Sequence, residues 1–141
     1  MTARRPLAFA GLAVVATVLV TGCGKPPQRI TVQSGTTSMW VAPAAECSGG
    51  TAYTKPGDCG DTGTTGPLLA LHGNRLTINV PVAVADSLWF ASAGSNQTAP
   101  TSRTFLALDG VQASSPVVIE VHEVKGPQSS STVWRFRVVS G

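Results

Sequence analysis

The chain has 141 residues, of which 43% are hydrophobic and only 12% are charged. Its 10 basic residues outnumber 7 acidic ones, for a formal net charge of +3. Because Arg4 and Arg5 lie at the very start, the rest of the chain is close to neutral. A near-neutral chain offers no broad basic surface, which excludes nucleic acid as an expected partner.

The N-terminal segment combines this basic start with an uncharged apolar run, Pro6 to Val20, that leads into Thr21-Gly22-Cys23. A spanning helix needs about 20 apolar residues, and this shorter run favours a cleaved secretory signal over the alternative, a retained transmembrane anchor. Val20-Thr21-Gly22-Cys23 resembles the lipobox of a bacterial lipoprotein signal. The resemblance implies cleavage at Gly22/Cys23 and attachment of a diacylglyceryl group to the Cys23 thiol.

Three parts of the chain follow from this interpretation. Residues 1–22 are expected to be the signal peptide, residues 23–28 the acylated cysteine with a short tether, and residues 29–141 a single domain. Acyl chains bury methylene groups in the bilayer, and two or more of them anchor a protein stably. We therefore expect a lipid-anchored protein at the extracytoplasmic face of the bacterial cytoplasmic membrane.

The chain has 3 cysteines, and Cys23 is assigned to lipid attachment. For an exported protein the remaining pair, Cys47 and Cys59, is most simply a disulfide. The loop between them is rich in turn-forming residues, and closing it is worth about 3 kcal/mol. The alternatives are a metal site and a redox dithiol, but the pair is not Cys-x-x-Cys and neither histidine is near it in sequence.

Beyond the tether the hydrophobic residues alternate with polar ones, as they do in strands with one buried face. No later stretch shows a helical apolar stripe, and residues Val82 to Asp86 are expected to form a single turn at most. The predicted strands cover Ile30–Gln33, Ser38–Ala42, Leu68–His72, Leu76–Val80, Leu88–Ala93, Thr104–Leu108, Val117–His122 and Trp134–Val138.

Short strands separated by Gly-, Pro- and Asn-containing turns predict an all-β, immunoglobulin-like two-sheet sandwich. The last two strands flank a polar connector, so we expect them to pair as a hairpin. One register places Ile119 beside Val138 and sets Glu120 opposite Arg137 on a solvated outer face. Pro81 is expected to end the strand before it, because it cannot donate a ladder hydrogen bond.

A family resemblance is carried by the cysteine pair, by residues Asn74 to Pro81, and by Val84-Ala85 leading to Leu88-Trp89. These features are similar to an actinobacterial lipoprotein family known only as a domain of unknown function. The resemblance implies a disulfide between Cys47 and Cys59 and a packing role for Trp89. It implies no catalytic residue, and the Gly- and Thr-rich stretch from Gly60 to Gly66 is longer than the family pattern.

Residues that could carry chemistry are few. A hydrolase needs a nucleophile with a base in reach, and the only histidines, His72 and His122, are both expected at the surface. Asp58 and Asp61 flank a cysteine but lack the spacing of a calcium loop. The sequence therefore predicts no enzyme, no metal and no cofactor.

Candidate binding residues are also few. Tyr53 lies in the Cys47–Cys59 loop and Trp40 shortly before it, and such aromatic side chains with polar neighbours can hold sugar rings or peptides. For Trp40 and Trp89, core packing is the favoured interpretation over ligand contact. The polar stretch from Ser92 to Ser102 is a second candidate, because recognition is usual in loops of a sandwich.

The favoured function is a lipid-anchored, non-catalytic recognition or scaffolding module of the cell envelope, with an envelope protein or wall polymer as partner. The alternative is a lipoprotein that binds a solute or cell-wall polymer through Tyr53 and nearby loops. A hydrolase is the less favoured third hypothesis. It requires His72 or His122 within hydrogen-bond reach of a serine or carboxylate in a concave site.

Overall fold

The computed structural model describes residues 28–48, 58–61, 66–126 and 131–141. The regular secondary structure of this part of the chain consists of strands and one short helix. The elements are β1 (Ile30–Ser34), β2 (Thr37–Val41), β3 (Pro43–Ser48), β4 (Asp58–Asp61), β5 (Leu68–Leu71), β6 (Arg75–Asn79), α1 (Val82–Ala85), β7 (Trp89–Ala93), β8 (Asn96–Gln97), β9 (Phe105–Asp109), β10 (Val117–Glu123) and β11 (Ser131–Ser140).

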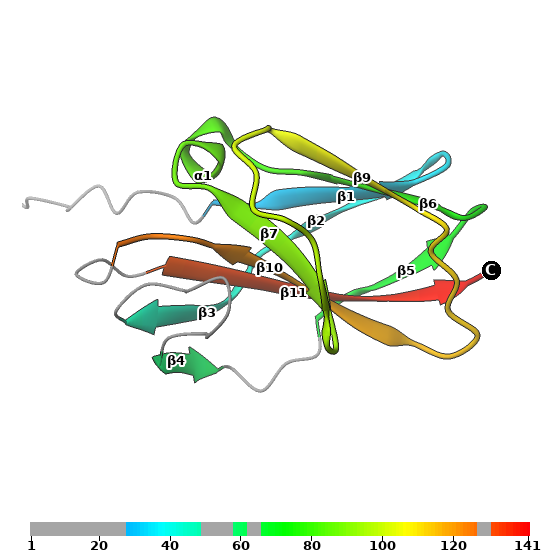
Figure 1. Ribbon diagram of the computed structural model, residues 1–141. Helices are drawn as coiled ribbons and strands as arrows, with labels where there is room; N and C mark the ends of the chain where they lie inside the picture. The colour runs from blue at the N-terminus through cyan, green and yellow to red at the C-terminus, as the bar shows by residue number, and fades with distance from the viewer. Residues whose placement is uncertain (1–27, 49–57, 62–65, 127–130) are drawn as a thin grey trace, which may run out of the picture.

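The strands form two sheets that pack face to face (Figure 1). One sheet has four strands in the order β2-β1-β6-β9, all antiparallel. The other has seven strands, in the order β4-β3-β11-β10-β7-β8, with β5 pairing in parallel to the C-terminal half of β11. The predicted all-β, two-sheet sandwich is confirmed, and the arrangement is consistent with an immunoglobulin-like fold.

The core lies between the sheets and follows the alternation of the sequence. In β1 and β6 the inward residues are Ile30, Val32, Leu76 and Ile78, all 0% exposed. The seven-stranded sheet contributes large side chains from β7, β10 and β11, namely Trp89, Ile119, Val121, Trp134, Phe136 and Val138.

Both core tryptophans have a partner for the indole N–H, as buried indoles require. Trp89 Nε1 donates to the Arg103 carbonyl at 2.7 Å, and Trp134 Nε1 donates to the Gln28 carbonyl at 2.8 Å. The second bond fixes the start of the described chain against β11. The core-packing prediction for Trp89 is therefore confirmed.

Each strand predicted from the sequence is present, and its ends lie within one residue of the prediction, except that β11 begins three residues earlier and ends two residues later than predicted. Pro81 follows the end of β6, and the turn after it is the four-residue helix α1. The glycine-containing turns expected between strands include those at Gly73, with φ +83°, and Gly110, with φ +73°, a backbone conformation that glycine adopts without steric cost.

Three strands were not predicted, because their sequences lack an alternating apolar pattern. β3 begins at a proline, β4 has the sequence Asp-Cys-Gly-Asp, and β8 has two residues. β4 and β8 lie at the two edges of the seven-stranded sheet. Edge strands need bury no face, which explains why hydrophobicity does not reveal them.

The predicted register of the β10–β11 hairpin is wrong by two residues. Ile119 faces Phe136, and Glu120 faces Arg135, not Arg137. A shift of two residues keeps every side chain on the same face, so the hydrophobic pattern cannot distinguish the two registers. Polar contacts accompany the observed register: Arg135 Nε donates to Glu120 Oε1 at 2.7 Å, and the Thr132 N–H donates to Glu123 Oε2 at 3.1 Å.

Candidate functional site

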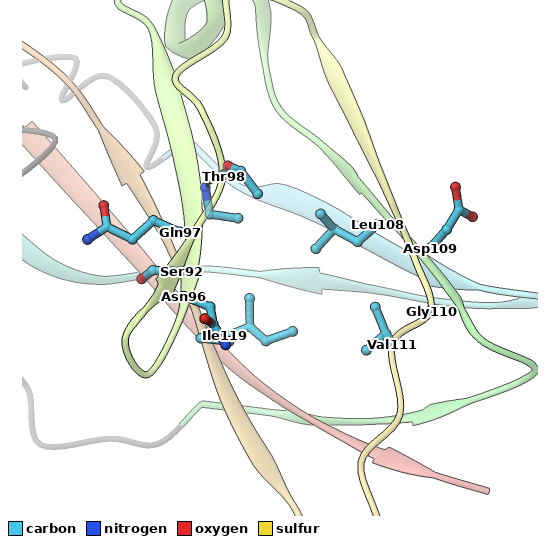
Figure 2. Close-up of a pocket in the computed structure, with 11 residues that line it drawn as sticks. Ser92, Asn96, Gln97, Thr98, Leu108, Asp109, Gly110, Val111 and Ile119 are labelled. Atoms are coloured by element: carbon cyan, nitrogen blue, oxygen red, sulfur yellow. Dashed lines mark hydrogen bonds between the residues drawn. The ribbon is translucent and has the colours of Figure 1, made fainter.

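A cavity of about 350 Å³ opens at one side of the sandwich, between an edge of each sheet (Figure 2). One wall comes from the β7–β8 hairpin of the seven-stranded sheet. The other comes from the end of β9 and the residues after it. The lining residues are Ala91, Ser92, Ala93, Asn96, Gln97, Thr98, Leu108, Asp109, Gly110, Val111 and Ile119.

The floor of the cavity is apolar, because inward-facing positions of β7, β9 and β10 meet there. Ile119 and Ala91 are buried, and Leu108, Val111 and Ala93 pack against the core with part of their surface accessible. Two of the five floor residues are alanines, whose short side chains leave the space open. A larger side chain at Ala93 would occupy it.

The rim is polar and nearly uncharged. Asn96 and Gln97 are exposed at the tip of the β7–β8 hairpin, and Thr98 holds the hairpin through its hydroxyl, which accepts from the Ala91 N–H at 3.0 Å. The one charged lining residue, Asp109, lies 3.6 Å from Arg75. Such a site suits an uncharged ligand with an apolar body and a polar end that meets the rim amides.

The predicted binding stretch Ser92 to Ser102 supplies five of the eleven lining residues. No local sequence pattern predicts the rest of the cavity. Leu108 and Val111 come beside β8 only through the packing of the two sheets, and Ile119 comes there through the pairing of β10 with β7.

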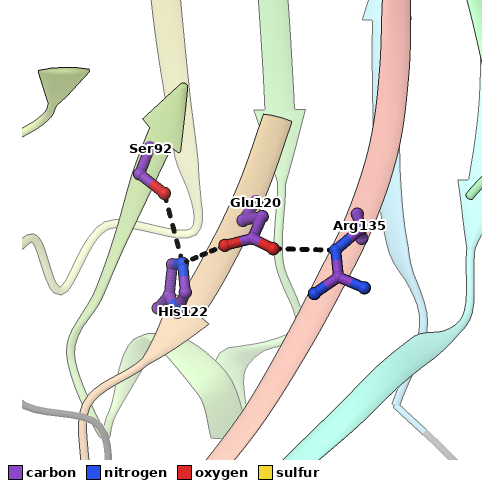
Figure 3. Close-up of polar contacts among 4 residues, drawn as sticks. All are labelled: Ser92, Glu120, His122 and Arg135. Carbon is purple, nitrogen blue, oxygen red and sulfur yellow. Dashed lines mark hydrogen bonds and ion pairs between the residues drawn. The ribbon is translucent and has the colours of Figure 1, made fainter. Parts of the chain in front are cut away.

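A polar network lies on the outer face of the seven-stranded sheet (Figure 3). The register places Glu120 of β10 between Ser92 of β7 and Arg135 of β11. His122 Nε2 lies 3.2 Å from Ser92 Oγ and 3.1 Å from Glu120 Oε2, and Arg135 Nε donates to Glu120 Oε1 at 2.7 Å.

His122 is buried, so the prediction that it lies at the surface is wrong. His122 is 6% exposed, and its ring stacks on the ring of Phe90 with the two centroids 4.8 Å apart. Burial lowers the pKa of His122 below its ordinary value of 6.5, against the opposing attraction and hydrogen bond of Glu120. His72 is exposed, as predicted.

The network does not form a nucleophile–base relay. Ser92 and Glu120 both contact the same ring nitrogen, so a neutral His122 that donates its Nε2 proton to the carboxylate has no lone pair there for the serine. The other nitrogen, Nδ1, is buried and has no hydrogen-bond partner among the described residues. A catalytic triad instead uses the two nitrogens for two different partners.

Trp40 is 69% exposed, so its predicted place in the core is wrong. The register of β1 and β2 pairs Trp40 with Thr31 on the outer face of the four-stranded sheet, whereas the neighbouring Val41 points inward. The Arg29 guanidinium lies 5.9 Å from the centroid of the indole, close enough for a cation–π contact. Ligand contact is the interpretation of Trp40 that remains.

The other predicted site residues are only partly described. Cys23 and Tyr53 lie outside the described residues. The backbone places Cys47 of β3 directly opposite Cys59 of β4. Within the described ranges, no three His, Cys, Asp or Glu side chains are grouped so that they could hold a metal.

The chain matches no family model, no curated protein and no solved structure. The resemblance to an actinobacterial lipoprotein family therefore stays a prediction. None of the helices in the described residues has the length and hydrophobicity to span a bilayer.

Proposed function

We propose that this chain is a lipid-anchored protein of the bacterial cell envelope that recognises a small, uncharged, partly apolar ligand without transforming it. The observation that carries the proposal is the cavity between the sheet edges, with its apolar floor and amide-bearing rim. Of the two non-catalytic functions that the sequence suggests, solute binding and scaffolding, the cavity favours solute binding.

The absence of a relay at Ser92 supports a binding role over a hydrolytic one. In the network of Figure 3, the Ser92 hydroxyl contacts Nε2 of His122. Because Glu120 competes for the same nitrogen of His122, the serine hydroxyl is not activated as a nucleophile.

The proposed location depends on the sequence around Cys23, and the strand register supports an oxidising compartment. Facing residues of an antiparallel pair have Cα atoms about 4.5 or 5.5 Å apart, and a disulfide spans both distances. The position of Cys47 opposite Cys59 therefore suits a disulfide between β3 and β4.

Lipid attachment and the disulfide are tested on protein purified from its own membrane. Mass spectrometry is expected to show a diacylglyceryl group on Cys23, and thiol alkylation of the denatured protein to label Cys47 and Cys59 only after reduction. Cys23→Ser is expected to move the protein out of the membrane fraction. An unmodified Cys23 or a free thiol at either strand position would contradict the proposal.

Ligand binding is tested by native mass spectrometry of the same preparation. The wild type is expected to carry a small molecule that Ala93→Leu, which fills the cavity, does not retain. Ala70→Leu is the matched control, because Ala70 is an exposed strand residue outside the cavity. Equal ligand content in the wild type and Ala93→Leu, or none in either, contradicts ligand recognition by the cavity.

A further inference from the structure

The outer face of the four-stranded sheet carries one row of side chains that crosses all four strands. Trp40 of β2 faces Thr31 of β1, Thr31 faces Asn79 of β6, and Asn79 faces Phe105 of β9. Paired residues of antiparallel strands point to the same side of a sheet. The row therefore has an aromatic ring at each end and two polar side chains between them.

Both rings are accessible. Trp40 is 69% exposed and Phe105 is 51% exposed, and they are the aromatic residues among the exposed large hydrophobic residues of the described chain. Neighbouring strands lie about 4.8 Å apart, so three strand spacings separate the two residues by about 14 Å. The Arg29 guanidinium lies beside the indole of Trp40, 5.9 Å from its centroid.

The rest of this face is polar but largely uncharged. The next row holds Ser38, Gln33, Thr77 and Ala107. The charged side chains that these four strands carry lie at the end of the face away from Asn79 and Phe105. There Arg75 of β6 and Asp109 of β9 form an ion pair with 3.6 Å between them. A strongly charged polymer or a lipid surface finds no matching charge in the middle of this face.

We propose that this face binds a neutral glycan chain. The faces of Trp40 and Phe105 carry partial negative charge and suit the C–H groups on the flat side of a sugar ring. Thr31 and Asn79 offer both donors and acceptors, as sugar hydroxyl groups do. An extended run of linked sugars lying along the row meets the two rings at its ends and the hydroxyl and amide groups between them.

A second copy of this chain is a poorer occupant. Pairing two such faces buries the hydroxyl and amide groups of Thr31, Gln33 and Asn79, and a buried polar group without a partner is costly. A glycan satisfies these groups itself. The inference goes beyond the proposed function, because none of Trp40, Thr31, Asn79 and Phe105 lines the cavity.

The full-length protein in detergent, titrated with neutral glycans of different linkage (dextran, mannan, galactan and arabinan), tests the proposal. Trp40 is the only exposed tryptophan, since Trp89 and Trp134 are 0% exposed, so a bound glycan is expected to change its emission. At least one of the glycans is expected to bind, and binding is expected to be insensitive to salt.

Variants locate the binding. Phe105→Ala keeps the fluorescent reporter and is expected to weaken binding about tenfold, because aromatic contacts often carry a large share of a binding energy. Trp40→Ala removes the reporter, so its glycan binding is measured by calorimetry. This variant is expected to weaken binding at least as much as Phe105→Ala. Leu68→Ala is the matched control, because Leu68 is 47% exposed but lies on β5 in the other sheet.

Three outcomes overturn the proposal. In the first, none of the glycans changes the tryptophan emission. In the second, a glycan binds but Trp40→Ala and Phe105→Ala bind it as the wild type does, and in the third, sedimentation shows a wild-type dimer that dissociates in these variants. Ala93→Leu is expected to bind glycans like the wild type, so that a failure of the cavity proposal and a failure of this one give different results.

Discussion

The two sheets of the sandwich have outer faces of opposite character. Across the seven-stranded sheet, one row joins Phe90, His122, Val133 and Ala45, and these residues are between 2% and 6% exposed. Across the four-stranded sheet, the row with Trp40 and Phe105 at its ends leaves both rings open to solvent.

The difference shows that strand alternation and burial are separate properties. Alternation decides which side chains share a face, and it does so equally well in both sheets. Whether the second face is covered depends on the rest of the fold. For this reason the sequence pattern leads to the wrong environment for two residues: Trp40 is exposed and not in the core, and His122 is buried and not at the surface.

The largest expected effect comes from matched phenylalanines on the two outer faces. Phe90→Ala is expected to lower the free energy of unfolding by about 3 kcal/mol, because it removes a buried ring that stacks on His122. Phe105→Ala is expected to change it by less than about 0.5 kcal/mol. Urea denaturation of both variants measures the contrast, and similar losses would remove the distinction between the faces.

The polar network gives the next effect. Glu120→Gln removes the negative charge that lies between His122 and Arg135 and is expected to cost about 2 kcal/mol, since Arg135 then loses a charge-assisted hydrogen bond. Glu46→Gln, at an exposed position of β3, is the control and is expected to have almost no effect. Equal stability of the two variants in thermal unfolding would show that the network contributes nothing.

The pH dependence of stability tests the burial of His122. Its folded-state pKa is lowered by burial, so below pH 6.5 the unfolded chain binds a proton that the folded chain resists. The free energy of unfolding is therefore expected to fall as the pH falls through 6.5, until the lower folded-state pKa is passed. His122→Gln is expected to flatten this slope. The same slope in the variant and the wild type would place the titrating group elsewhere.

The smallest expected effect on stability is that of Trp40→Ala, within about 0.5 kcal/mol of the wild type because the side chain is exposed. Its spectroscopic effect is expected to be large. Acrylamide is expected to quench a red-shifted component of the wild-type emission, and the variant is expected to lack it. Quenching that persists in Trp40→Ala would mean that Trp89 or Trp134 is accessible in solution.

Much of the fold was predictable because two-residue periodicity survives in most of the strands. Residues such as Val32, Ile78 and Phe136 fill the core as their alternation predicts. The β10–β11 register was not predictable, since a shift of two residues preserves every face. Strands β3, β4 and β8 were missed because they carry no periodic apolar signal.

The candidate site was predictable only in part. The polar stretch from Ser92 to Ser102 was recognised as a place for binding, and it forms one wall of the cavity. The opposite wall comes from Leu108 and Val111, which nothing in the local sequence connects with that stretch. The four-strand row on the open face likewise exists only once the strand order β2-β1-β6-β9 is known.

The sequence by itself determined the class of fold and the residues that point inward along most strands, because side-chain alternation is a local property of an extended backbone. It also carries the expectation of a lipid anchor, which depends on a short segment around Cys23. The tertiary structure alone decided which outer face is open, which strand edges enclose a cavity and which polar residues meet. These properties depend on pairing between distant segments, whose registers and neighbours the local pattern leaves undetermined.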